Sequence, residues 1–127
     1  KLLTDEWKRG GLAEDKYGVL TDFITRQWSG MKTREYKNHK GLKKESLRDN
    51  MTNIELALNT LAEASTTEIS RQQNPDSLSQ HIRVAKSGGN VAKVARAELE
   101  SKLGRSVISS AKASDYLKGQ EPPKEIE

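Results

Sequence analysis

The sequence predicts an all-α protein, a compact bundle of five to seven helices with a disordered C-terminal tail. Three observations indicate this class. Apolar residues recur three and four positions apart, and no segment keeps the alternation of a half-buried strand. Helix-capping residues precede several of these segments, and glycines follow them. Aromatic residues make up only 5% of the chain, so the core must rely on Leu, Ile, Val and Ala, which suits packed helices.

The 127 residues are expected to form one helical domain, at residues 1–118, followed by a disordered tail at residues 119–127. The tail contains two adjacent prolines and too few apolar residues to fold. No apolar run approaches the roughly 18 residues of a membrane span, so we expect no membrane association. The chain has no cysteine, which excludes disulfides and thiolate metal sites and is compatible with a reducing cytoplasm. We expect a cytoplasmic protein, associated with the nucleoid if it binds DNA. Because it begins at Lys1 rather than Met, we expect a fragment of a larger protein.

The first quarter of the chain predicts two helices. Thr4 is a suitable N-cap for a short helix that ends at Gly10 and Gly11. A second helix is expected over residues 14–28, with Gly30 as its left-handed C-cap. Its apolar stripe is formed by Tyr17, Leu20, Ile24 and Trp28, with Phe23 beside them.

The middle of the chain predicts one long helix after two short segments. Thr33 is expected to cap a short helix through Asn38, and residues 42–50 are expected to form a second short segment, which is helical if Leu47 and Met51 point inward. Thr52 and Glu55 then have the spacing of a capping box, which starts a helix to about residue 71. Its inward face is expected to comprise Ile54, Ala57, Leu58, Leu61, Ser65 and Ile69.

The last part of the chain predicts two helices and a final turn. Asn74 and Pro75 are suited to the N-cap and first position of a helix that ends at Gly88-Gly89. Asn90 is expected to cap the next helix, which Gly104 ends. A buried extended piece at residues 107–108 and a last turn over residues 110–117 should follow. The inward residues are expected to be Leu78, Ile82 and Ala85, then Val91, Ala92, Val94, Ala95, Leu99 and Leu103.

Charge is distributed in blocks, although the net charge is only +4. Residues 26–48 carry eight basic and two acidic side chains, and residues 83–105 carry six basic and two acidic. The segment between them, residues 49–82, carries one basic and five acidic side chains. Two interpretations are open: the basic blocks fold against the acidic helix and neutralise it, or both lie on one face and bind phosphate.

The basic blocks suggest a site for nucleic acid. Lys and Arg neutralise phosphates, and the interleaved Trp28, Tyr36 and His39 could stack on unpaired bases, although the two larger rings could equally be core. The hypothesis is that two patches of cations contact DNA phosphates. The first patch comprises Arg34, Lys37, Lys40, Lys43, Lys44 and Arg48, and the second comprises Lys86, Lys93 and Arg96.

Catalytic and cofactor chemistry is not indicated. Only His39 and His81 could act as imidazole bases, and nothing places a nucleophile beside them. The turn at residues 87–90 lacks the glycine pattern and the preceding strand of a nucleotide-binding loop. We therefore expect no enzymatic activity, no cofactor and no metal. The rival function is a protein-interaction or dimerisation module, since Leu56 lies off the apolar stripe of the acidic helix and could mark a partner surface.

Short pieces of sequence between about Leu3 and Leu117 carry a family resemblance. They include residues 6–10, 17–22, 28–31, 34–37, 40–44, 50–52, 55–57, 62–69, 88–92, 95–96 and 99–100. Together they resemble the C-terminal region of the DNA-damage-inducible protein D family, which includes prophage antirepressor-like proteins. The resemblance implies a bacterial protein of the SOS response that acts near DNA, or docks onto a recombination protein or repressor. It also implies an N-terminal BRO-type domain, which this chain does not include.

Overall fold

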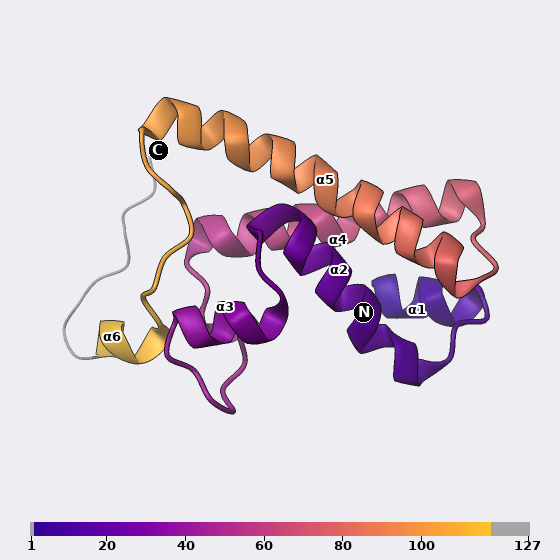
Figure 1. Cartoon of the computed structure of the whole chain (residues 1–127), viewed down its shortest axis with the longest axis horizontal. Coiled ribbons are helices and arrows are strands. Elements are labelled where there is room, and N and C mark those ends of the chain that lie inside the picture. Colours follow the sequence, from indigo (N-terminus) through magenta and orange to yellow (C-terminus); the bar gives the residue numbers. More distant parts are fainter. Residues whose placement is uncertain (1, 118–127) are drawn as a thin grey trace.

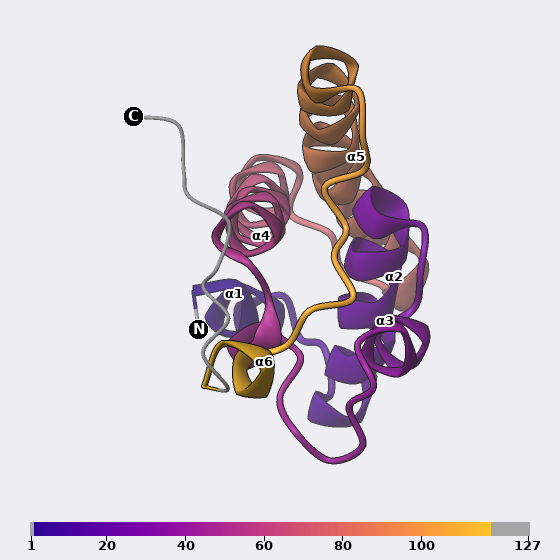
Figure 2. The same ribbon diagram turned by 90° about the vertical axis from the view of Figure 1, so that its left-hand side faces the viewer.

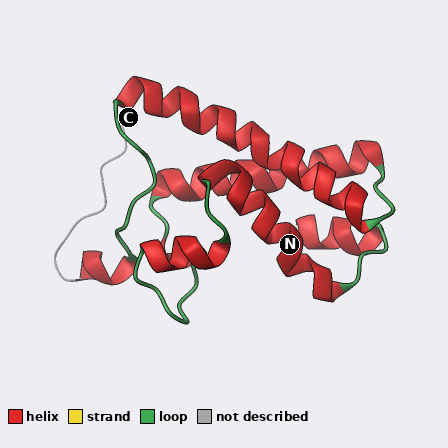
Figure 3. Ribbon diagram, in the orientation of Figure 1, coloured by secondary structure: helices red, strands yellow, loops and turns green. Residues whose placement is uncertain are grey.

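The computed structural model describes residues 2–117, and every regular element in that part of the chain is a helix (Figure 3). The predicted all-α class is confirmed, and the predicted tail at residues 119–127 lies outside the described residues. Among the helices of residues 2–117, none combines the length and the apolar character that spanning a membrane requires. The elements are α1 (Leu2–Arg9), η1 (Glu14–Lys16), α2 (Tyr17–Ser29), α3 (Thr33–His39), η2 (Arg48–Asn50), α4 (Asn53–Gln73), α5 (Leu78–Leu103) and α6 (Ala113–Leu117).

Helix α5 organises the bundle. It packs against both α4 and α2, and its C-terminal end extends beyond the ends of these two helices (Figure 1). Figure 2 shows α4 on one side of α5 and α2 on the other. Helix α1 lies against α4, and α3 packs against α2. Because α2 is placed between α5 and α3, its outward side borders both of them.

The predicted break at Gly88-Gly89 is wrong, since α5 continues through both glycines for 26 residues. The glycines serve helix packing instead. A Cβ on Gly88 would lie 1.8 Å from Thr66 Oγ1 of α4, and one on Gly89 would lie 2.7 Å from Gln27 Cβ of α2. The pair therefore lets α5 approach two helices at once, and this contact outweighs the low helix propensity of glycine.

The buried face of α4 also differs from the predicted one. Leu58 is buried as expected, but Ile54 and Leu61 remain 38% and 37% exposed. Small and polar residues take the inner positions: Glu55, Asn59, Ala62, Thr66, Thr67 and Ser70. They are tolerated because their polar atoms are bonded, as Thr66 Oγ1 donates to the Ala62 carbonyl at 2.8 Å. Short side chains at these positions permit the close crossing of α5.

Several helix ends agree with the sequence and others do not. The Thr52 capping box is formed, with the Thr52 N–H donating to Glu55 Oε1 at 2.9 Å and the Glu55 N–H to Thr52 Oγ1 at 3.3 Å. Gly30 and Gly104 adopt the left-handed conformation at the ends of α2 and α5. Asn74, by contrast, caps the end of α4 with φ 49°, and Ser77 is the N-cap of α5.

The remaining short elements shift by a few residues. Thr4 lies inside α1 instead of capping it, because α1 includes Leu2 and Leu3. Leu47 is buried and Met51 partly buried, but within residues 42–50 only η2 is helical, so inward-pointing side chains do not make the whole segment a helix. Val107 is buried and Ile108 partly buried, but the segment that leads from α5 to α6 is irregular, with a bend at Val107. Helix α6 occupies part of the predicted last turn.

Candidate nucleic-acid interface

Helix α2 has one buried side and one partly exposed side. Leu20, Ile24 and Trp28 point into the core. Residues three and four positions apart along the other side are only partly covered, namely Val19, Asp22, Phe23 and Arg26. This outward side borders three adjoining hollows on the surface of the protein.

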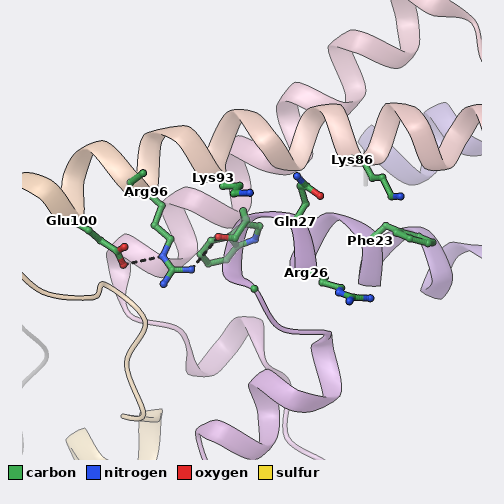
Figure 4. A pocket seen from close by; sticks show the side chains of 10 residues that line it. Phe23, Arg26, Gln27, Lys86, Lys93, Arg96 and Glu100 are labelled. Carbon is green, nitrogen blue, oxygen red and sulfur yellow. Dashed lines mark hydrogen bonds and ion pairs between the residues drawn. The ribbon is translucent and has the colours of Figure 1, made fainter.

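The first hollow, the α2–α5 groove, has a volume of about 580 Å³. Lys86, Lys93 and Arg96 line it from α5, while Phe23 and Arg26 line it from α2. Figure 4 shows Lys86 extending from α5 toward Phe23. The Lys86 ammonium lies 5.2 Å from the centre of the Phe23 ring, a cation–π distance.

Arg96 is occupied by the protein itself. Its guanidinium donates to the carbonyls of Trp28 and Ser29 at 3.2 and 2.9 Å and forms an ion pair with Glu100 at 2.9 Å. Burial opposes ionisation of Glu100, but the Val107 N–H and the Arg96 guanidinium together hold the pKa of that carboxyl below its ordinary value. Glu100 is therefore charged near neutral pH, and Arg96 ties α5 to the end of α2.

The second hollow, the α2–α3 groove, has a volume of about 760 Å³. Arg34 and Lys37 line it from α3, and Lys43 lines it from the turn that follows. Asp22 of α2 is the one carboxylate among its lining residues. The Asp22 side chain accepts a hydrogen bond from the Thr33 N–H at 3.1 Å, which fixes the start of α3.

A smaller central hollow of about 200 Å³ connects the two grooves. It shares Phe23 and Arg26 with the α2–α5 groove and Asp22 with the α2–α3 groove, and it adds Val19 and Lys32. We call the three hollows together the basic face. Their lining side chains include two carboxylates and eight cations, which are Arg26, Lys32, Arg34, Lys37, Lys43, Lys86, Lys93 and Arg96.

Lys40, predicted to contact DNA, lies instead in the core. Its side chain is 0% exposed and forms an ion pair with Glu55 of α4 at 2.8 Å. The Lys40 ammonium also donates to the carbonyls of Ser109 and Ala111, both at 2.7 Å. It is buried because the C-terminal segment covers it. Burial, and then a hydrogen bond to Glu55, raise the pKa of Tyr36, so its hydroxyl stays protonated and donates to the same carboxylate.

Two more predicted residues lie outside the basic face. Arg48 forms an ion pair with Glu63 of α4 at 2.9 Å, so it neutralises the acidic helix. Lys44 is exposed, but it lines none of the three hollows. The structure thus brings together Arg34, Lys37 and Lys43 in one groove and Lys86, Lys93 and Arg96 in the other.

The predicted site omitted residues on the outward side of α2. Phe23 and Arg26 line two of the hollows each, and Lys32 lines the central one. A signal for the first two is present in the sequence, because Val19, Asp22, Phe23 and Arg26 share one side of a helix whose opposite side is apolar. Their position beside Lys86, about 60 residues later in the chain, follows only from the packing of α5.

Within residues 2–117, no three His, Asp or Glu side chains are grouped so that they could hold a metal ion. No protein-family model, curated protein or solved structure matches the chain.

Proposed function

We propose that this chain is a non-catalytic module of a DNA-damage-response or antirepressor-like protein, and that its basic face binds DNA phosphates. The sequence resemblance supports the first part of the proposal. The second part depends on one observation: two blocks of cations far apart in sequence border a single helix and line adjoining hollows. Cations arranged along a path can neutralise successive phosphates and release their counterions.

The charge on this face is weakly compensated. Asp22 and Glu100 are the two carboxylates among its lining residues, and Glu100 is already paired with Arg96. Among the described residues, Arg26, Lys37 and Lys93 form no ion pair. A surface of this kind attracts polyanions, because unpaired cations in a hollow concentrate the positive potential.

The proposal is tested by removing two cations from the α2–α5 groove. Lys86→Gln/Lys93→Gln should weaken binding of a fluorescent DNA, measured by anisotropy, and should reduce the slope of log Kd against log salt. Each lost phosphate contact lowers that slope by roughly 0.7–0.9. Lys86 and Lys93 share one side of α5, since they are seven positions apart, or about two turns.

Lys8→Gln/Lys102→Gln is the matched control, with the same loss of charge. Lys8 is on α1, and Lys102 is about 180° around α5 from Lys93. The control should leave the salt slope unchanged. Equal losses in the two double variants would show that net charge alone attracts DNA, and the proposed site would then be wrong.

A protein partner is the second candidate function, and exposed apolar side chains favour it. Val91 and Val94 on α5 are 41% and 61% exposed, and Ile54 and Leu61 on α4 are also exposed. If the wild-type chain binds no DNA even at low salt, the basic face is not a DNA site. Docking onto a recombination protein, a repressor or a second copy then becomes the leading proposal, and sedimentation would report self-association.

A further inference from the structure

We infer that the basic face takes single-stranded rather than duplex nucleic acid, with one base stacked on Phe23; this inference rests on the proposed phosphate binding. Two aromatic residues of the basic block lie in the core. Trp28 and Tyr36 are 1% and 0% exposed, with ring centres 6.0 Å apart in the core. Neither is available to a base.

Phe23 is the aromatic residue that the fold places among the cations. It is partly buried, and it lines both the α2–α5 groove and the central hollow. Arg26 lines the same two hollows one helical turn later, and Lys86 lies over the ring (Figure 4). A ring flanked by cations is the arrangement with which proteins bind single strands, because a base stacks while its neighbouring phosphates are neutralised.

The position of the Phe23 ring favours single-stranded DNA over duplex DNA. Phe23 borders a hollow of about 580 Å³ rather than protruding from the surface. In a duplex the bases are paired inside the helix, so only phosphates and groove edges can meet such a site. An unpaired base can turn into the hollow and cover the ring.

The groove alone has the size of a small-ligand pocket, which makes a free nucleotide the alternative. The extended charge argues for a strand instead. The central hollow continues from Phe23 to Lys32, and the α2–α3 groove adds Lys37 and Lys43 beyond it. A single nucleotide would leave these cations unused, whereas a strand can follow them.

The experiment compares three labelled ligands of equal length: oligo(dT), a mixed-sequence duplex and an abasic strand with the same phosphates. Oligo(dT) should bind more tightly than either of the others at the same salt concentration. Phe23→Leu should weaken oligo(dT) binding about fivefold or more, the loss expected for one stacked base. It should leave abasic-strand binding and the salt slope unchanged, because no cation is removed.

Val94→Ala is the control, since Val94 carries no ring, is 61% exposed and lines none of the three hollows. Phe23→Trp gives a second readout that does not depend on the stability of the leucine variant. Trp7 and Trp28 are buried, so emission from an added Trp at this position should be quenched by oligo(dT) and not by the abasic strand.

The outcomes separate this inference from the proposed function. Equal binding of duplex and oligo(dT), with no effect of Phe23→Leu, would overturn the stacking inference and leave the phosphate face intact. A free nucleotide that competes as well as the strand would overturn it too. No binding of any nucleic acid would remove both proposals.

Discussion

At the scale of single residues, Lys40 shows how a cation in a basic segment becomes a core residue. Its ammonium meets one carboxylate, Glu55, and two backbone carbonyls of the C-terminal segment. Three acceptors around a primary ammonium satisfy its three donors. Desolvation of the charge is costly, and this complete set of bonds is what offsets it.

Lys40→Met should therefore destabilise the protein by about 3–5 kcal/mol, because it leaves the Glu55 carboxylate buried without its cation. Adding Glu55→Gln should recover part of this loss, since the buried charge is then removed as well. Urea unfolding followed by circular dichroism measures both effects. Lys44→Met, at an exposed position of the same segment, should change stability by no more than about 0.5 kcal/mol. A similar loss for Lys40→Met and Lys44→Met would contradict the structural role of the pair.

The sequence could not distinguish Lys40 from its neighbours. Lys37, Lys40 and Lys43 follow one another at helical spacing, and composition treats them alike. What differs is the covering segment at Ser109 and Ala111, about 70 residues later in the chain. Burial of a charge depends on such distant contacts, whereas the Thr52 capping box is local and was predicted correctly.

At the scale of elements, the glycine pair of α5 decides how three helices meet. Gly88 faces α4 and Gly89 faces α2, so adjacent residues serve two different contacts. Consecutive positions of a helix lie about 100° apart, which matches two neighbours on different sides. The Gly89 contact holds α2 against α5 beside the α2–α5 groove, and the Gly88 contact holds α4 against the same helix.

Gly88→Ala should destabilise the protein by at least about 2 kcal/mol, even though Ala is the better helix former by about 1 kcal/mol. The added Cβ would lie 2.6 Å from the Thr66 backbone, so α4 and α5 would have to separate. Gly18→Ala is the matched control, because a Cβ there meets nothing within 4 Å and the helix propensity should dominate. Thermal unfolding of the two variants should shift in opposite directions; equal shifts would mean that the crossing is looser than described.

The glycine pair also shows where pattern analysis of elements fails. Two glycines in succession ordinarily favour the end of a helix, and local propensity contains nothing to oppose this. The helix continues because Thr66 and Gln27 pack directly against the backbone of the two glycines, and this contact exists only in the assembled bundle. Gly30 and Gly104 were predicted correctly because their left-handed conformation is a local requirement.

At the scale of the whole molecule, both interpretations of the charge blocks hold in part. Lys40 and Arg48 pair with Glu55 and Glu63, so some cations of the first block do neutralise the acidic helix. Others line the two grooves on either side of α2, where the second block contributes Lys86 and Lys93. The fold thus divides one run of positive charge between internal pairing and the basic face.

If the basic face acts as one surface, the effect of each groove should depend on the length of the bound strand. A strand of about 16 nucleotides, within the range of known single-strand sites, should span both grooves. Lys37→Gln/Lys43→Gln in one groove and Lys86→Gln/Lys93→Gln in the other should then each weaken binding. Their effects on log Kd should add when combined, because distant sites act independently.

For a strand of about 4 nucleotides, only one of the two double variants should weaken binding, because so short a strand occupies a single groove. Anisotropy with both strand lengths at one salt concentration gives the comparison, and Lys8→Gln/Lys102→Gln again controls for net charge. If the longer strand responds to one pair alone, the grooves bind separately and the two basic blocks do not form one site. If each double variant weakens binding of the long and the short strand equally, the cations act through the general electrostatic field of the protein. Direct contact with successive phosphates would instead make the effect of each groove depend on strand length.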